Sequence, residues 1–265
     1  MATEQKKDAL QQPTGNMARP SFIEDSTAGT EGITADELKF PRLAIAQGPS
    51  PQLVPGDSAY IPGLTLFQMF NDLTKEIYGM GPMTLVVGDR RVKRIEFELD
   101  EKGRPDRKRP VDLEVPVDDP RMKWTKDPTT GKGVPPVAIK FVEFLSLIVH
   151  PDGRLPEPVV VSIQETNKFN RRAHMSWTGF IKMRQPPAPI YAGLYTMTIK
   201  TEKNDQGTFG VWVPENSGYI TDRKLYERAK EFHFGIQGKE YTVDREVGAD
   251  DFDPADLEDA DRSGM

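Results

Sequence analysis

The chain has 265 residues and a net charge of -6, from 35 lysines and arginines against 41 aspartates and glutamates, and it contains no cysteine. Without cysteine it forms no disulfide, thiolate metal site or cysteine nucleophile, and its three widely separated histidines do not indicate a zinc site. No segment has the roughly 20 apolar residues that cross a bilayer, and the amino end lacks an apolar secretory signal, so we expect a cytoplasmic protein with no membrane contact and no cofactor.

Both ends of the chain differ in composition from its middle. Residues 1–35 are polar and have no hydrophobic period, so we expect a disordered N-terminal segment. Residues 246–265 are expected to form an acidic tail, because the stretch from Asp250 to Arg262 has seven acidic residues and one basic residue. That excess equals the net charge of the whole chain. The rest of the chain is therefore neutral overall, and the folded domain is placed at residues 36–245.

The first half of this domain is expected to contain extended segments and one long insertion. Four prolines prevent a long helix before residues 60–70, which we expect to be extended or looped. In residues 83–99 the second half alternates: Arg94 and Glu96 share one face of a strand, while Ile95 and Phe97 share the other. Residues 100–136 are charged and rich in proline, which predicts an inserted loop region.

The second half is predicted to contain the centre of a sheet. Residues 137–149 have two largely apolar faces, which is typical of a central strand. Residues 158–164 predict another strand. Residues 191–201 are expected to pair with residues 208–213 in a hairpin, across a turn-forming hexapeptide at 202–207.

Two helices are predicted between and after these strands. The first follows a cap at Thr166 or Asn167 and has an apolar stripe formed by Phe169, Ala173, Trp177, Phe180 and Ile181. That stripe assigns Trp177 and Phe180 to the core. The second begins at Thr221 or Asp222, buries Leu225, Ala229 and Phe232, and ends at Gly235. The elements together predict a mainly β fold with a few helices, of the α+β class, built as a small barrel or curled sheet.

Catalytic motifs have little support in the sequence. The glycine and lysine at 131–132 lack the first glycine and the hydroxyl residue of a phosphate-binding loop. Asp152 and Glu165 could hold the metal of a nuclease, but the lysine expected two residues after the glutamate is Asn167, with Lys168 one place late. We therefore expect no enzyme, and a metal-dependent nuclease stays as a minor alternative.

Two stretches of the chain combine cations with nearby aromatic residues. Residues 90–109 contain nine basic and five acidic residues, and residues 165–184 contain five and one. Such runs are often only solvated faces. Binding of single-stranded nucleic acid, however, needs cations that follow the phosphates and flat side chains that stack on bases. The residues expected to neutralise phosphate are Arg90, Arg91, Lys93, Arg94, Lys168, Arg171, Arg172 and Lys182. The residues expected to stack are Trp124, Tyr191 and Trp212, the last pointing outward beside Lys200.

The segments 38–51 (LKFPRLAIAQGPSP) and 189–195 (PIYAGLY), the strand-rich middle and the acidic finish resemble bacteriophage single-stranded DNA-binding proteins, over residues 38–262. The resemblance implies an oligonucleotide-binding (OB) five-stranded barrel with insertions. It also implies an acidic tail that recruits replication and recombination enzymes and competes with DNA for a basic groove. The acidic residues of that tail are Asp250, Asp251, Asp253, Asp256, Glu258, Asp259 and Asp261.

Two features depart from this pattern. The chain ends without the terminal aromatic residue that such tails commonly present, so docking would use Phe252. The insertion at 100–136 is larger than a minimal barrel needs, and it has no cysteine for the metal that some relatives place there.

The leading hypothesis from the sequence is non-catalytic, sequence-independent binding of single-stranded DNA in phage replication or recombination. The rival, from another class, is a structural or assembly protein of a phage particle. In that case the lysines are merely solvated and the tail contacts a basic partner.

Overall fold

The computed structural model describes residues 39–99, 105–126, 128–129, 131, 133–134, 136–165, 167–204, 207–239 and 241. All of them belong to one compact unit, residues 35–265. The predicted N-terminal segment at 1–35 and the predicted acidic tail at 246–265 lie outside the described residues.

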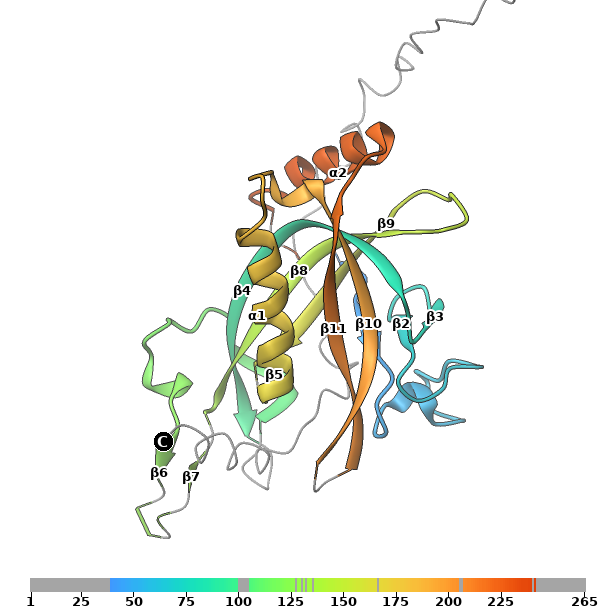
Figure 1. Ribbon diagram of the computed structural model, residues 1–265. Helices are drawn as coiled ribbons and strands as arrows, with labels where there is room; N and C mark the ends of the chain where they lie inside the picture. The colour runs from blue at the N-terminus through green and yellow to red at the C-terminus, as the bar shows by residue number, and fades with distance from the viewer. Residues whose placement is uncertain are drawn as a thin grey trace, which may run out of the picture. The chain divides into compact units, whose positions relative to one another are not determined.

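An antiparallel sheet of six strands forms the body of the protein (Figure 1). Its main path has the order β11-β10-β4-β8-β9. These strands are β4 (Met83–Leu99), β8 (Ala138–Val149), β9 (Glu157–Gln164), β10 (Gly193–Asn204) and β11 (Gly207–Tyr219). A sixth strand, β5 (Pro105–Asp112), pairs with the far end of β4. Since β8 pairs with β4 on one side and β9 on the other, the predicted central strand is confirmed.

A second, smaller sheet has the order β1-β2-β3, with β1 (Leu43–Ile45), β2 (Met69–Asn71) and β3 (Ile77–Gly79). Of residues 60–70, predicted to be extended or looped, only the last two are strand; four of the others form turns and five have no regular structure. A short 3-10 helix, η2 (Pro51–Leu53), precedes them.

The chain around β1 lies between the two outer strands of the large sheet. Arg42 forms a parallel bridge with Val160 of β9. At the other end, the Gln47 side chain donates to the carbonyl of Gly210 in β11 at 2.8 Å and accepts from its amide at 2.9 Å. These contacts do not join the outer strands to each other in a ladder. The described strands form antiparallel sheets and no closed barrel. The α+β class is confirmed.

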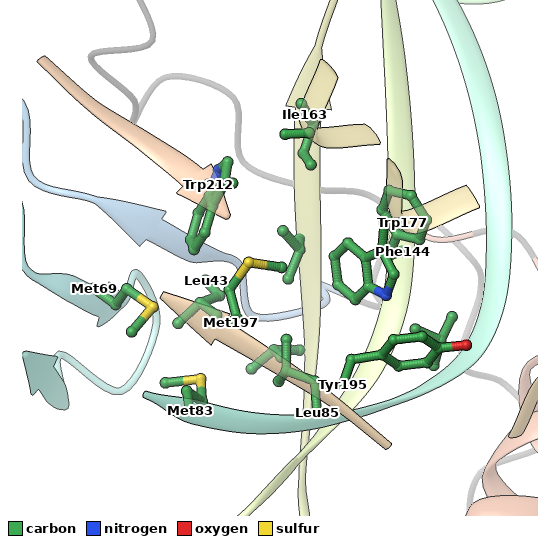
Figure 2. Packing of buried hydrophobic residues seen from close by; sticks show 14 of the residues in the cluster. Leu43, Met69, Met83, Leu85, Phe144, Ile163, Trp177, Tyr195, Met197 and Trp212 are labelled. Atoms are coloured by element: carbon green, nitrogen blue, oxygen red, sulfur yellow. The ribbon is translucent and has the colours of Figure 1, made fainter. Parts of the chain in front are cut away.

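Two helices cover opposite faces of β8. Alternate residues of β8 point to opposite sides, and Phe144 packs in the main core with Trp177 of α1 (Lys168–Lys182), as Figure 2 shows. Leu147, on the other side, packs with Ala229 of α2 (Arg223–Ile236). Both helices begin at a predicted cap, because the Asn167 and Asp222 side chains accept backbone N–H groups at 2.8 and 2.7 Å. The second helix ends one residue later than predicted.

The insertion between β4 and β8 is more ordered than the loop predicted for 100–136. Besides β5 it contains the 3-10 helix η3 (Pro120–Met122) and a small ribbon of β6 (Thr125–Lys126) and β7 (Gly133–Val134). A further 3-10 helix, η4 (Ile190–Ala192), leads into β10.

Candidate nucleic-acid interface

The four cations predicted on β4 lie on two opposite sides of the sheet. Arg90 is the cross-strand partner of Phe144, and Arg94 is the partner of Lys140, so both lie on the side of the sheet that faces α1. Arg91 and Lys93 alternate with them and lie on the side covered by α2. The four cations, all expected to neutralise phosphate, therefore do not share one surface, because neighbouring residues of a strand point to opposite faces.

Arg91 and Lys93 bind the end of the chain's own second helix. The Arg91 guanidinium donates to the carbonyls of Ile236 at 2.7 Å and Lys239 at 2.6 Å. Lys93 donates to the carbonyl of Tyr241 at 3.4 Å. Both cations lie over the Tyr241 ring, 4.9 and 4.5 Å from its centroid, and the Tyr241 hydroxyl donates to the buried Glu143 at 2.9 Å. These two cations stabilise the C-terminal end of α2 rather than an open binding surface.

The exposed face of α1 is strongly cationic. Four exposed cations lie on it: Lys168, Arg171, Arg172 and Lys182. The last three follow Lys168 by three, four and fourteen residues, and these spacings place all four on one side of the helix. The helix contains no acidic residue. The side chain of Met175, which lies on the same face, is 60% exposed. The prediction for α1 thus agrees with the exposure of these four side chains.

Lys140 of β8 and the cations of α1 meet at the N-terminal end of the helix. Glu165 lies there, with its Oε2 atom 2.5 Å from Lys140 Nζ and 3.1 Å from His174 Nε2, and its Oε1 atom accepts from Arg171 at 3.1 Å. The contact with His174, reinforced by Lys140, lowers the pKa of Glu165 to about 2. Further along the helix, Arg90 donates to the Thr178 hydroxyl at 3.0 Å.

Seven cations on this side of the sheet form what we call the α1-side surface: Arg90, Arg94, Lys140, Lys168, Arg171, Arg172 and Lys182. Lys140 was missed by the sequence analysis, because it lies alone among the apolar residues of β8. Its cross-strand pairing with Arg94 could not be read from either segment by itself.

Two of the three predicted stacking residues are buried. The exposed fractions of Trp212 and Tyr191 are 5% and 8%. Trp212 belongs to the main core, and Tyr191 packs 5.7 Å from the Tyr226 ring of α2. The expectation that Trp212 points outward is wrong because β11 is covered on both faces: Trp212 faces the core, and the neighbouring Phe209 meets Phe169 of α1 at 5.4 Å.

Trp124 is the predicted stacking residue that is exposed, at 42%. Lys200 is exposed as well, and its Nζ atom donates to Glu202 on the same strand at 2.7 Å. The predicted tail residues Asp250, Asp251, Phe252, Asp253, Asp256, Glu258, Asp259 and Asp261 lie outside the described part of the chain.

The two acids of the nuclease alternative lie at opposite ends of β9. Asp152 is in the turn before this strand, 3.5 Å from Arg154, and Glu165 follows its last residue. An eight-residue strand is about 25 Å long at roughly 3.3 Å per residue, so the two carboxylates do not share a metal ion. Within the described residues, no group of three or more His, Cys, Asp or Glu is arranged to hold a metal.

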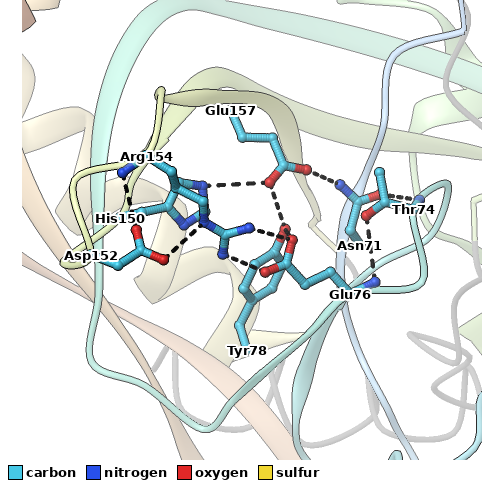
Figure 3. Close-up of polar contacts among 8 residues, drawn as sticks. All are labelled: Asn71, Thr74, Glu76, Tyr78, His150, Asp152, Arg154 and Glu157. Atoms are coloured by element: carbon cyan, nitrogen blue, oxygen red, sulfur yellow. Dashed lines mark hydrogen bonds and ion pairs between the residues drawn. The ribbon is translucent and has the colours of Figure 1, made fainter.

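A polar cluster that the sequence analysis did not identify joins the turn after β8 to the β2–β3 hairpin (Figure 3). Glu157 accepts from Asn71 at 2.6 Å and from the Tyr78 hydroxyl at 3.0 Å, and it lies 3.5 Å from the buried His150. Arg154 contacts Glu76 through both terminal nitrogens, which lowers the pKa of that carboxyl. Burial, together with Glu157, raises the pKa of Tyr78. These contacts connect the two sheets.

A model of the Pam3 phage gp34-like protein family matches residues 13–242, which is most of the chain. No curated protein and no solved structure matches it. Among the helices of the described residues, none is both long and apolar enough to cross a membrane.

Proposed function

The chain belongs to the Pam3 phage gp34-like protein family, and we propose that it is a non-catalytic protein that binds single-stranded DNA through the α1-side surface. The observation that carries this proposal is the exposed face of α1, which has four cations on a helix without a single acid. That face continues into the sheet through Arg94 and Lys140. The phosphate backbone of a single-stranded nucleic acid is the ligand that such a row of flexible cations can bind.

The order of the strands supports a distant relation to the OB fold. Taken in chain order, β4, β8, β9, β10 and β11 form the path β11-β10-β4-β8-β9, with α1 between the third and fourth of them. An OB fold is a partly open five-stranded barrel that binds oligonucleotides with the face of its second and third strands and with two loops. Here the loop after the first of these strands is the insertion at 100–137, and α2 covers the outer face of β8. We therefore place the DNA on the α1 side.

Binding of this kind is expected to be independent of base sequence. Lysine and arginine side chains on an exposed helix face contact phosphates, which carry no sequence information. Any sequence can become single-stranded during phage replication or recombination, so a protein of these processes needs binding that is independent of base sequence. We further propose that the acidic tail docks the enzymes of these processes. Its charge favours that role, since residues 246–265 hold eight acidic residues and one basic residue, while residues 39–241 hold 25 acidic and 30 basic ones.

The experiment is fluorescence anisotropy with a labelled single-stranded oligonucleotide over a series of salt concentrations. The test variant is K168Q/R172Q/K182Q on α1. Its matched control is R223Q/K224Q/K230Q, which removes the same charge from exposed residues of α2. Each neutralised phosphate contributes a slope of about -0.7 in log affinity against log salt. We expect the α1 variant to lose roughly 2 units of slope and the α2 variant to keep the wild-type slope.

Three results would overturn this proposal. If the wild type does not bind at low salt, the chain is better explained as a structural or assembly protein of the particle. If both triple variants lose slope equally, net charge and not the α1-side surface governs binding. If the oligonucleotide is degraded when magnesium is added, the protein is an enzyme.

A further inference from the structure

Arg121, in the short helix η3, is held by three carboxylates from three parts of the chain. Its guanidinium donates to Glu96 of β4 at 2.6 Å, to Asp112 of β5 at 3.0 Å and to Asp119 at 2.8 and 2.9 Å. Asp119 also caps η3, since its side chain accepts the backbone N–H of Arg121 at 2.9 Å. The side chain of Arg121 thus makes charge-assisted hydrogen bonds to three carboxylates, and it connects η3 to β4 and β5.

This connection fixes the insertion on the α1 side of the sheet. Glu96 is two residues after Arg94 on β4 and pairs with Ala138, two residues before Lys140 on β8. The alternation is regular over this part of the pair, so Glu96, Arg94 and Lys140 lie on the same face. Arg121 therefore holds η3 beside Arg94 and Lys140 of the α1-side surface. In Figure 1 the insertion extends from the end of β4 that lies near the start of α1.

Trp124 is three residues after Arg121 and directly precedes β6 of the small ribbon. A Cβ atom added to Gly133 of β7 would meet the Trp124 ring at 3.3 Å, so one part of the ring rests against the glycine backbone. The side chain is nevertheless 42% exposed. Lys123 and Lys126, on either side of it in the chain, are exposed too. An indole half-supported by the backbone and flanked by two cations is a surface suited to stacking on a base.

We propose that residues 119–126 and 133–134 form an arm that presents Trp124 to the bases of a DNA strand bound at the α1-side surface, and that Arg121 is the positioning residue of this arm. The inference rests on the proposed function and deepens it. Phosphates contact the α1-side surface, and at least one base stacks on Trp124. Arg121 contributes by holding the arm and contacts no phosphate itself.

The first test measures binding with one single variant, D119N, whose electrostatic and positional effects have opposite signs. D119N makes the chain less negative, so electrostatics alone predicts tighter binding to DNA. Because it removes the carboxylate that accepts three hydrogen bonds from Arg121, loosening of the arm predicts weaker binding. We expect D119N to weaken binding about fivefold, the loss that corresponds to about 1 kcal/mol of base stacking, with an unchanged salt slope.

The second test compares R121Q with R109Q, which removes the same charge from an exposed arginine of the same insertion that pairs with Glu98 and Asp106. We expect R121Q to weaken binding about as much as W124L does, with no change of salt slope, and R109Q to have little effect. A slope reduced by about 0.7 in R121Q would identify Arg121 as a phosphate ligand and overturn its positioning role.

A readout without DNA separates this inference from the proposed function. In protein labelled with 5-fluorotryptophan, the ¹⁹F spectrum has one resonance for each of the three tryptophans, and W124L identifies that of Trp124. We expect R121Q and D119N to shift or broaden this resonance and to leave the buried Trp177 and Trp212 unchanged. An unaffected Trp124 resonance overturns the positioning role whatever the ligand is. Wild-type binding that W124L does not weaken overturns the stacking role and leaves the α1-side surface as the DNA site.

Discussion

Phe144 of β8 and Trp177 of α1 stack on each other, with ring centroids 4.1 Å apart and planes inclined by 17° (Figure 2). Neither side chain is accessible to solvent, and the Tyr195 ring meets the edge of Trp177 at 5.9 Å. This stack attaches the cationic helix to the central strand of the sheet. The position of the candidate DNA surface therefore depends on a contact in the core.

Replacing Trp177 by alanine is expected to destabilise the protein by about 3–5 kcal/mol, because it leaves a cavity between α1 and β8. W177F should cost less, since the indole Nε1 atom donates no hydrogen bond to the described residues. Unfolding in urea, followed by circular dichroism, measures both values. F234A is the control, because Phe234 is 57% exposed and its loss should change stability little. Equal stability of W177A and the wild type would contradict the packing of α1 described here.

Replacing Arg91 by methionine is expected to loosen the end of α2 by about 1–3 kcal/mol, because it removes the donor to two carbonyl groups while keeping much of the side-chain volume. Hydrogen exchange of the amides in residues 230–239 would detect this. R228M on the exposed side of α2 serves as control. The salt slope of DNA binding should be unchanged in R91M. A lower slope with unchanged exchange would mean that Arg91 contacts phosphate, as the sequence first indicated.

The elements that sequence patterns predicted well are those specified by local signals. The strand β8, the strand β10 and both helices lie within a few residues of the ranges expected from them, and β11 begins as expected but continues six residues further, to Tyr219. Their hydrophobic period and their caps at Asn167 and Asp222 are contained in short windows of sequence. The exposure of the α1 cations follows from the same local signal, since a helix exposes the side opposite its apolar stripe.

The errors concern contacts between distant parts of the chain. The prediction that Trp212 points outward assumed that one face of β11 meets solvent. This strand is covered on both sides. Arg91 and Ile236 are 145 positions apart, so no local pattern could show that the arginine is occupied. The role of Arg121 was missed because its three carboxylates come from β4, β5 and the turn before η3.

Stability in acid should depend on Glu165. Its pKa of about 2 in the folded protein is below the ordinary value of 4.5, so the ionised carboxylate stabilises the fold at neutral pH. This contribution is complete above pH 4.5 and is lost as the pH falls towards 2. We expect E165Q to be less stable than the wild type at pH 7 by about 1–3 kcal/mol and nearly equal to it at pH 2. E202Q, at the exposed pair with Lys200, is the control. A constant difference between pH 7 and pH 2 would show that Glu165 acts by packing and not by its charge.

Deleting residues 249–265 is expected to tighten the binding of single-stranded DNA at low salt. The deletion removes seven of the chain's acidic residues and one basic residue from a protein whose folded part carries more basic than acidic side chains. Carboxylates that compete with phosphate act over the Debye length, which falls from about 10 Å at 0.1 M salt to about 3 Å at 1 M. The gain should therefore disappear at high salt. A full-length variant with every acid from Asp250 to Asp261 changed to its amide separates charge from length. If only the deletion tightens binding, the tail obstructs the DNA sterically. If neither change does, the tail does not compete with DNA, and docking of a partner protein is its remaining proposed role.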